Sequence, residues 1–112
     1  MPELHQVILS PEAEKNIEEA FVWIARSDET AAKNWYEGLM AAIMALSKFP
    51  LRYPLSPESR LGLVDVEVRQ MLYGKNFWKY RVLYTVRGDH VWIAHIRHGA
   101  RLRLGEETSN DE

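Results

Sequence analysis

Apolar residues recur along this chain with two different spacings, and the spacing changes near the middle. In the first half they return every three or four positions, which is typical of helices that bury one face. The first run holds Ala13, Ile17, Ala20, Phe21 and Ile24, and the second holds Ala32, Trp35, Leu39, Ala42, Ile43 and Leu46. Ser10 and Pro11 form a helix start before the first run, and residues 27–30 form a break and a second start. We therefore expect helices to about Arg26 and Lys48, joined as an antiparallel hairpin.

The second half of the chain shows the alternation of polar and apolar residues that is typical of strands. The expected strands are 4–9, before the first helix, and then 65–73, 77–87 and 90–98. The separators Gly74-Lys75-Asn76 and Gly88-Asp89 are typical hairpin turns. The order β-α-α-β-β-β predicts an α+β fold, with the helical hairpin packed on one face of an antiparallel sheet.

Prolines and charges mark the segments outside these elements. Pro50, Pro54 and Pro57 indicate that residues 49–64 form a loop with turns and no regular element. Residues 104–112 carry four acids and no base, which predicts a flexible acidic tail. We expect one domain over residues 1–103.

Basic residues are expected to gather on one face of the sheet. If the hairpins are centred on Lys75 and Gly88, Arg69 lies opposite Arg81, and Arg81 lies opposite His95. That face would present Arg69, Lys79, Arg81, His95 and Arg97. The face toward the helices would present Val66, Val68, Tyr80, Val82, Tyr84, Val86, Trp92, Ala94 and Ile96. Like charges placed opposite each other destabilise a sheet, so an anionic ligand or an acidic partner would fit this face. The alternatives are a register slip that separates these side chains, or pairing with carboxylates of the chain itself.

The charge distribution supports a basic C-terminal third. The formal net charge is −2, but residues 1–65 carry six Lys/Arg against ten Asp/Glu, whereas residues 66–103 carry eight against two.

The sequence has no cysteine, and His95 and His98 alternate across a strand, so no metal site is expected. No glycine-rich phosphate loop is present, and no cofactor is expected. The start of the chain lacks a signal-peptide pattern and no run is long enough to span a membrane, which favours the cytoplasm.

Several segments, in order and at their spacings, form a pattern known from one family. They are Ser10-Pro11-Glu12-Ala13-Glu14, Ile17, Trp23-Ile24-Ala25, Phe49-Pro50, Arg69, Tyr80-Arg81-Val82-Leu83-Tyr84 and His95-Ile96-Arg97-His98-Gly99-Ala100-Arg101. Over roughly residues 6–101 the chain resembles the RelE/ParE toxin superfamily of type II toxin–antitoxin systems. The resemblance implies two N-terminal helices packed on an antiparallel sheet. It also implies a cognate antitoxin that wraps the toxin, with operator DNA bound only through that antitoxin.

The resemblance leaves two targets open. ParE-like members are associated with DNA gyrase, and RelE-like members cut messenger RNA in the ribosome. If the chain were a RelE-like endoribonuclease, the resemblance carried over by position would make Arg69, Arg81 and His98 its catalytic residues. For contact with the antitoxin or target, the candidate residues are Arg69, Lys79, Arg81, His95, Arg97 and Arg101. An inactive member of the superfamily is the third possibility.

Three features favour the ParE branch and a protein that binds its target over an endoribonuclease. The opening motif is of the ParE type. The chain is slightly acidic, whereas ribosome-directed members are strongly basic. The loop 49–64 contains only Arg52 and Arg60 as basic residues, not the lysine-rich stretch that suits a polyanionic site.

Overall fold

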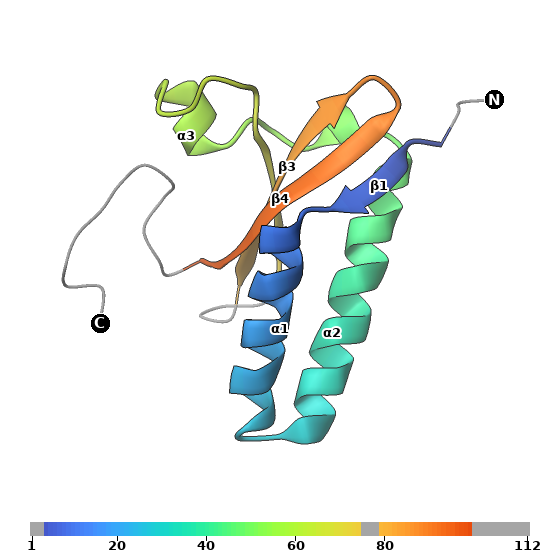
Figure 1. The fold of residues 1–112 in the computed structure, drawn as a ribbon, viewed down its shortest axis with the longest axis vertical. Coiled ribbons are helices and arrows are strands. Elements are labelled where there is room, and N and C mark those ends of the chain that lie inside the picture. Colours follow the sequence, from blue (N-terminus) through green and yellow to red (C-terminus); the bar gives the residue numbers. More distant parts are fainter. Residues whose placement is uncertain (1–3, 75–78, 100–112) are drawn as a thin grey trace.

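The computed structural model describes residues 4–74 and 79–99 of the 112-residue chain. In chain order the elements are β1 (Gln6–Leu9), α1 (Pro11–Ala25), α2 (Glu29–Met44), the 3-10 turns η1 (Ala45–Ser47) and η2 (Pro50–Arg52), α3 (Pro57–Arg60), β2 (Arg69–Tyr73), β3 (Tyr80–Arg87) and β4 (His90–His98). The predicted α+β class and the helical hairpin are confirmed, and Figure 1 shows α1 and α2 side by side. The tail expected at 104–112 lies outside the described residues.

Both long helices begin at the predicted start signals. The Ser10 side chain accepts a hydrogen bond from the Ala13 N–H at 2.9 Å, and the Asp28 side chain accepts one from the Ala31 N–H at 3.0 Å. These oxygens satisfy N–H groups that have no partner inside the helix. The second helix ends at Met44 rather than near Lys48, because its last turn tightens into η1.

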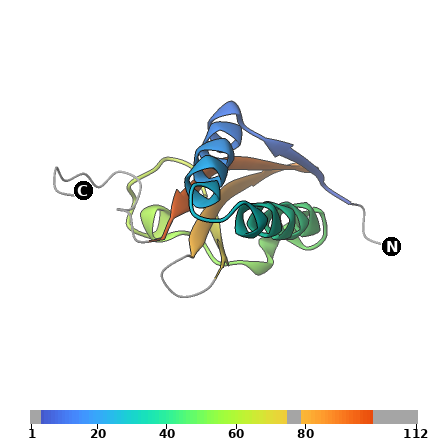
Figure 2. The same ribbon diagram turned by 90° about the horizontal axis from the view of Figure 1, so that it is seen from below.

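The expectation that residues 49–64 contain no regular element is wrong. They hold η2 and the short helix α3. Ser56 caps α3 by accepting the Ser59 N–H at 3.2 Å, and Pro57 occupies its first turn. This is the same Ser-Pro start that opens α1, but the helix it begins is too short to show periodicity. Figures 1 and 2 show α3 apart from the α1–α2 hairpin.

The sheet has the order β1-β4-β3-β2 and is mixed. Pairing of β2 with β3 and of β3 with β4 is antiparallel, as predicted, whereas β1 pairs with β4 in parallel. The prediction of an entirely antiparallel sheet is therefore wrong for β1. The chain leaves β1 through the helical hairpin and returns to β4 only after two further strands, which leaves the two strands pointing the same way.

A β-bulge in β4 decides which of its side chains are buried. Val82 pairs with Ile96 and Tyr84 pairs with Ile93, so β4 has one residue more than β3 between these pairs. The N-cap residue of α1 holds the bulge, because Ser10 Oγ donates to the Ala94 carbonyl at 2.8 Å. Nearby, the Asn16 side-chain oxygen accepts the Ile96 N–H at 3.0 Å.

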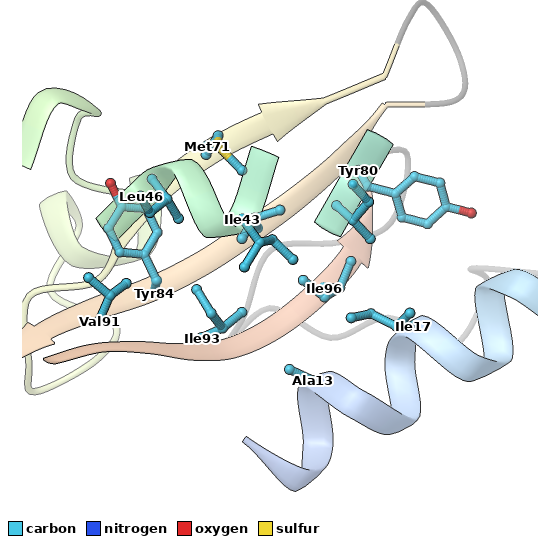
Figure 3. Packing of buried hydrophobic residues seen from close by; sticks show 12 residues of the cluster. Ala13, Ile17, Ile43, Leu46, Met71, Tyr80, Tyr84, Val91, Ile93 and Ile96 are labelled. Carbon is cyan, nitrogen blue, oxygen red and sulfur yellow. The ribbon is translucent and has the colours of Figure 1, made fainter. Parts of the chain in front are cut away.

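The bulge overturns part of the predicted core. Strict alternation placed Trp92 and Ala94 toward the helices, but Trp92 is 38% exposed, whereas Val91 and Ile93 are fully buried. Val66, also predicted inside, is exposed. Figure 3 shows Ala13 and Ile17 of α1 and Ile43 of α2 meeting the strand residues Ile93 and Ile96. In the described part of the chain, no helix is long and apolar enough to cross a membrane.

Candidate functional site

Arg81 lies on the sheet face turned away from the two long helices, and it is buried. Its Nη2 donates to both carboxylate oxygens of Glu58 in α3, at 2.6 and 2.8 Å, and its Nε donates to the Gln70 side-chain oxygen at 2.7 Å. The exposed fractions of the two charged side chains are 7% for Arg81 and 0% for Glu58. Arg81 is therefore neutralised by the chain itself, as one of the two alternatives from the sequence proposed.

Arg69 lies on the other face. It pairs with Tyr84, and its neighbour Met71 pairs with Val82, so these residues share the face of the buried core. The Arg69 Nη1 donates to the Tyr53 carbonyl at 2.7 Å and contacts the Leu51 carbonyl at 3.5 Å. Its guanidinium thus holds the segment that follows η2.

The predicted row of opposed cations is wrong in its register. Arg69 faces Tyr84 rather than Arg81, and Leu72 occupies the place opposite Arg81. The displacement is three positions, and an odd displacement transfers a side chain to the other face of the sheet. Arg69 and Arg81 consequently do not share a surface.

Arg97 and His95 do lie on the face of Arg81. Arg81 pairs with Arg97, not with His95 as predicted, and His95 pairs with Leu83. This displacement is two positions, which preserves the face. Arg97 is half-buried, and its Nε has no hydrogen-bond partner among the described residues. Burial lowers the pKa of His95; the nearby Glu12 carboxylate raises it and Arg97 lowers it, both to a smaller extent.

The remaining predicted residues are dispersed. Lys79 is exposed just before β3, and its carbonyl accepts the Gly99 N–H at 2.6 Å. His98 pairs with Tyr80, and the two rings meet edge to face with centroids 5.2 Å apart, so His98 lies on the helix side. Arg101 lies outside the described residues. Across residues 4–74 and 79–99, no group of three or more His, Asp or Glu side chains could hold a metal ion.

A groove of about 720 Å³ between α1 and α2 was not predicted from the sequence. Its apolar lining residues are Leu9, Ile17, Phe21, Tyr36 and Met40, and its charged ones are Glu14, Glu18, Lys33 and Glu37. Phe21 and Tyr36 meet edge to face across the helices, with centroids 6.2 Å apart. The available signal was that Tyr36 and Met40 flank the second apolar run, and that Phe21 belongs to the first. The groove therefore combines apolar side chains with a predominantly acidic set of charges.

Comparison with known proteins identifies the family. Residues 7–103 match the family model described as "ParE toxin of type II toxin-antitoxin system, parDE". The chain belongs to the ParE toxin family. No curated protein matches it. Among solved structures, it is similar to a chain of the "Chromosomal ParDE TA system from P. aeruginosa", with a TM-score of 0.64 and 12% sequence identity over 85% of this chain and 96% of that chain.

Membership of the ParE toxin family confirms the resemblance inferred from the ordered sequence segments. The solved structure, at its low identity, supports the fold alone. This ParE-family chain is thus a toxin of a type II toxin–antitoxin system, and its two strand arginines, Arg69 and Arg81, both form hydrogen bonds within the chain.

The titration of His95 should make this toxin less stable in mild acid. Because the folded pKa is below the ordinary value of about 6.5, the unfolded state binds more protons once the pH falls below that value. The stability contributed by neutral His95 is then lost progressively down to the folded pKa. Urea unfolding at pH 7.5 and 5.5 should show a smaller acid-induced loss in His95→Gln than in the natural protein. Equal losses would contradict this assignment.

Proposed function

We propose that this ParE-family toxin arrests growth by binding a type II topoisomerase such as DNA gyrase, and that it does not cut RNA. The observation that carries this proposal is the burial of Arg81 against Glu58. RNA cleavage at a ribose 2′-hydroxyl needs a base, an acid and cations gathered around one phosphate. Arg81 is occupied internally, Arg69 is on the opposite face and His98 is on the helix side. This arrangement supports a toxin that acts through protein contact.

The cations that remain on or near the sheet face turned away from α1 and α2 are proposed to contact the target. Arg97 lies near the end of β4, close to the half-buried His95, and Lys79 precedes β3. Arg101, which follows β4 in the sequence, is proposed for the same contact. Arg69 and Arg81 would support this surface from inside the fold, because each holds a neighbouring segment through hydrogen bonds.

A cognate antitoxin is proposed to neutralise the toxin by covering the groove between α1 and α2. The groove offers apolar contacts next to Glu14, Glu18 and Glu37, so it fits an amphipathic segment with apolar and basic residues. The sequence favoured an anionic ligand or an acidic partner on the basic face, whereas the charges of the groove favour a partner segment that carries basic residues. In this proposal the complex binds operator DNA through the antitoxin and acts in the cytoplasm.

The proposal is tested with the purified full chain and two assays run side by side. With gyrase and relaxed plasmid, the chain should inhibit supercoiling or trap cleaved DNA, and prior mixing with the product of the neighbouring gene should abolish this effect. With translating ribosomes, primer extension should show no new messenger RNA ends. Codon-positioned cuts by the natural chain that disappear in a folded His98→Ala variant would instead establish the RelE-like alternative.

A further inference from the structure

Residues 48–53, between α2 and α3, present two large apolar side chains to solvent. Phe49 is 64% exposed and Leu51 is 61% exposed. Phe49 also has φ 49° and ψ 54°, and among the described residues it is the only non-glycine with a positive φ. The left-handed conformation is unfavourable for a residue with a Cβ atom, and such strain persists only where the surroundings impose it.

The surroundings impose it through a set of hydrogen bonds to the backbone of this segment. Buried Tyr84 donates its hydroxyl to the Pro50 carbonyl at 2.6 Å, and Arg69 donates to the Tyr53 carbonyl at 2.7 Å. Burial raises the pKa of Tyr84 to about 12, so its hydroxyl stays a donor at neutral pH. Pro50 itself is buried, which anchors the segment between the two exposed residues. Phe49 and Leu51 are thus displayed on a backbone that the core holds in place.

Such a display does not serve the fold, because the two side chains bury little of their surface and the backbone is strained. It does suit binding, since a rigid aromatic side chain loses little conformational entropy when it enters a partner's pocket. We propose that Phe49 and Leu51 form a wedge that inserts into an apolar pocket on the toxin's protein target. The proposal deepens the proposed function and rests on it.

The charges around the wedge define the partner's pocket. Lys48 and Arg52 are exposed on either side of it, and residues 45–57 contain no Asp or Glu. The Arg52 guanidinium lies 5.4 Å from the centre of the Tyr53 ring, which holds its charge beside the wedge. The complementary surface is therefore an apolar pocket with an acidic rim. The groove between α1 and α2 has the opposite charge, with three glutamates and one lysine, so the two surfaces fit different partners.

Replacing Phe49 with glycine separates binding from folding. Glycine adopts the left-handed conformation without strain, so the melting temperature of Phe49→Gly should equal or exceed that of the natural chain. The concentration of purified chain that inhibits gyrase by half should rise at least about tenfold. Expression in cells should then no longer arrest growth at the inducer level that suffices for the natural chain. Leu61→Ala, which removes an apolar side chain that is 60% exposed elsewhere, should change neither activity.

The outcomes distinguish the wedge from the function on which it rests. Full growth arrest by a folded Phe49→Gly chain would overturn the wedge. Growth arrest that is retained but no longer relieved by the antitoxin would also overturn it, because the partner would then be the antitoxin. A natural chain that arrests growth without inhibiting gyrase would refute the topoisomerase target alone. Comparing growth arrest by the natural chain and by Phe49→Gly would then still test whether the wedge binds the target. A natural chain that arrests no growth would end both proposals.

Discussion

Replacing Glu58 with alanine is expected to lower the free energy of unfolding by about 3–5 kcal/mol. The substitution leaves the Arg81 guanidinium in a site where its side chain is only 7% exposed, without the carboxylate that accepts two of its hydrogen bonds. It also removes the contact between α3 and β3 that Glu58 makes with Arg81. Urea unfolding followed by circular dichroism measures the loss. A domain of this size has roughly 5–15 kcal/mol in total, so the expected loss is a large part of its stability.

The matched control is Glu67→Ala, which removes an exposed glutamate from the loop after α3 and should change stability by no more than about 0.5 kcal/mol. A second control replaces both partners with apolar residues, as Glu58→Leu with Arg81→Met. Because no unpaired charge then stays buried, the double variant should lose less stability than Glu58→Ala alone. If Glu58→Ala behaved like Glu67→Ala, the buried ion pair would have no structural role.

Ile93→Ala should cost about 2–5 kcal/mol, the range for removing a fully buried aliphatic side chain. The neighbouring Trp92→Ala should cost less, although tryptophan is much larger, because Trp92 is 38% exposed on the other face. The order of the two losses tests the β-bulge, since strict alternation along β4 would reverse it. Chemical unfolding of both variants under one set of conditions gives the comparison.

Local signals in the sequence predicted the elements well. Ser10 and Asp28 mark helix starts through their own side chains, and apolar spacing marks the helices and strands that follow. The start of α3 carries the same Ser-Pro signal, at Ser56-Pro57. Its four residues are too few to show a period, so the prolines of the segment indicated a loop.

Pairing between elements could not be predicted in the same way. The register of β2 and β3 depends on the conformation of the connecting turn, and a displacement of three positions moved Arg69 to the core face. The bulge at Ala94 depends on a hydrogen bond donated by Ser10 and one accepted by Asn16, and both residues are about 80 positions away in the sequence. Glu58 reaches Arg81 across 23 positions. Periodicity carries no information about contacts of this range.

The candidate site in the structure therefore differs from the one that the sequence predicted. The sequence showed that the C-terminal third of the chain is basic. It did not show that Arg81 is neutralised by Glu58, because Glu58 lies in residues 49–64, which were expected to form a loop. The groove between α1 and α2 is formed by residues from two helices whose relative rotation the sequence does not specify. The sequence placed Phe49 only within the family pattern, and it did not predict the exposure or the left-handed backbone of this residue, which depend on hydrogen bonds from Arg69 and Tyr84 to the backbone of the same segment.

Growth arrest by the double variant, Glu58→Leu with Arg81→Met, tests most directly whether Arg81 is a structural residue. Provided that the variant melts near the temperature of the natural chain, its expression should stop growth at the same inducer level, because Arg81 would contribute only to the fold. A folded double variant that leaves cells growing normally would show instead that the Arg81 guanidinium takes part in the toxic activity.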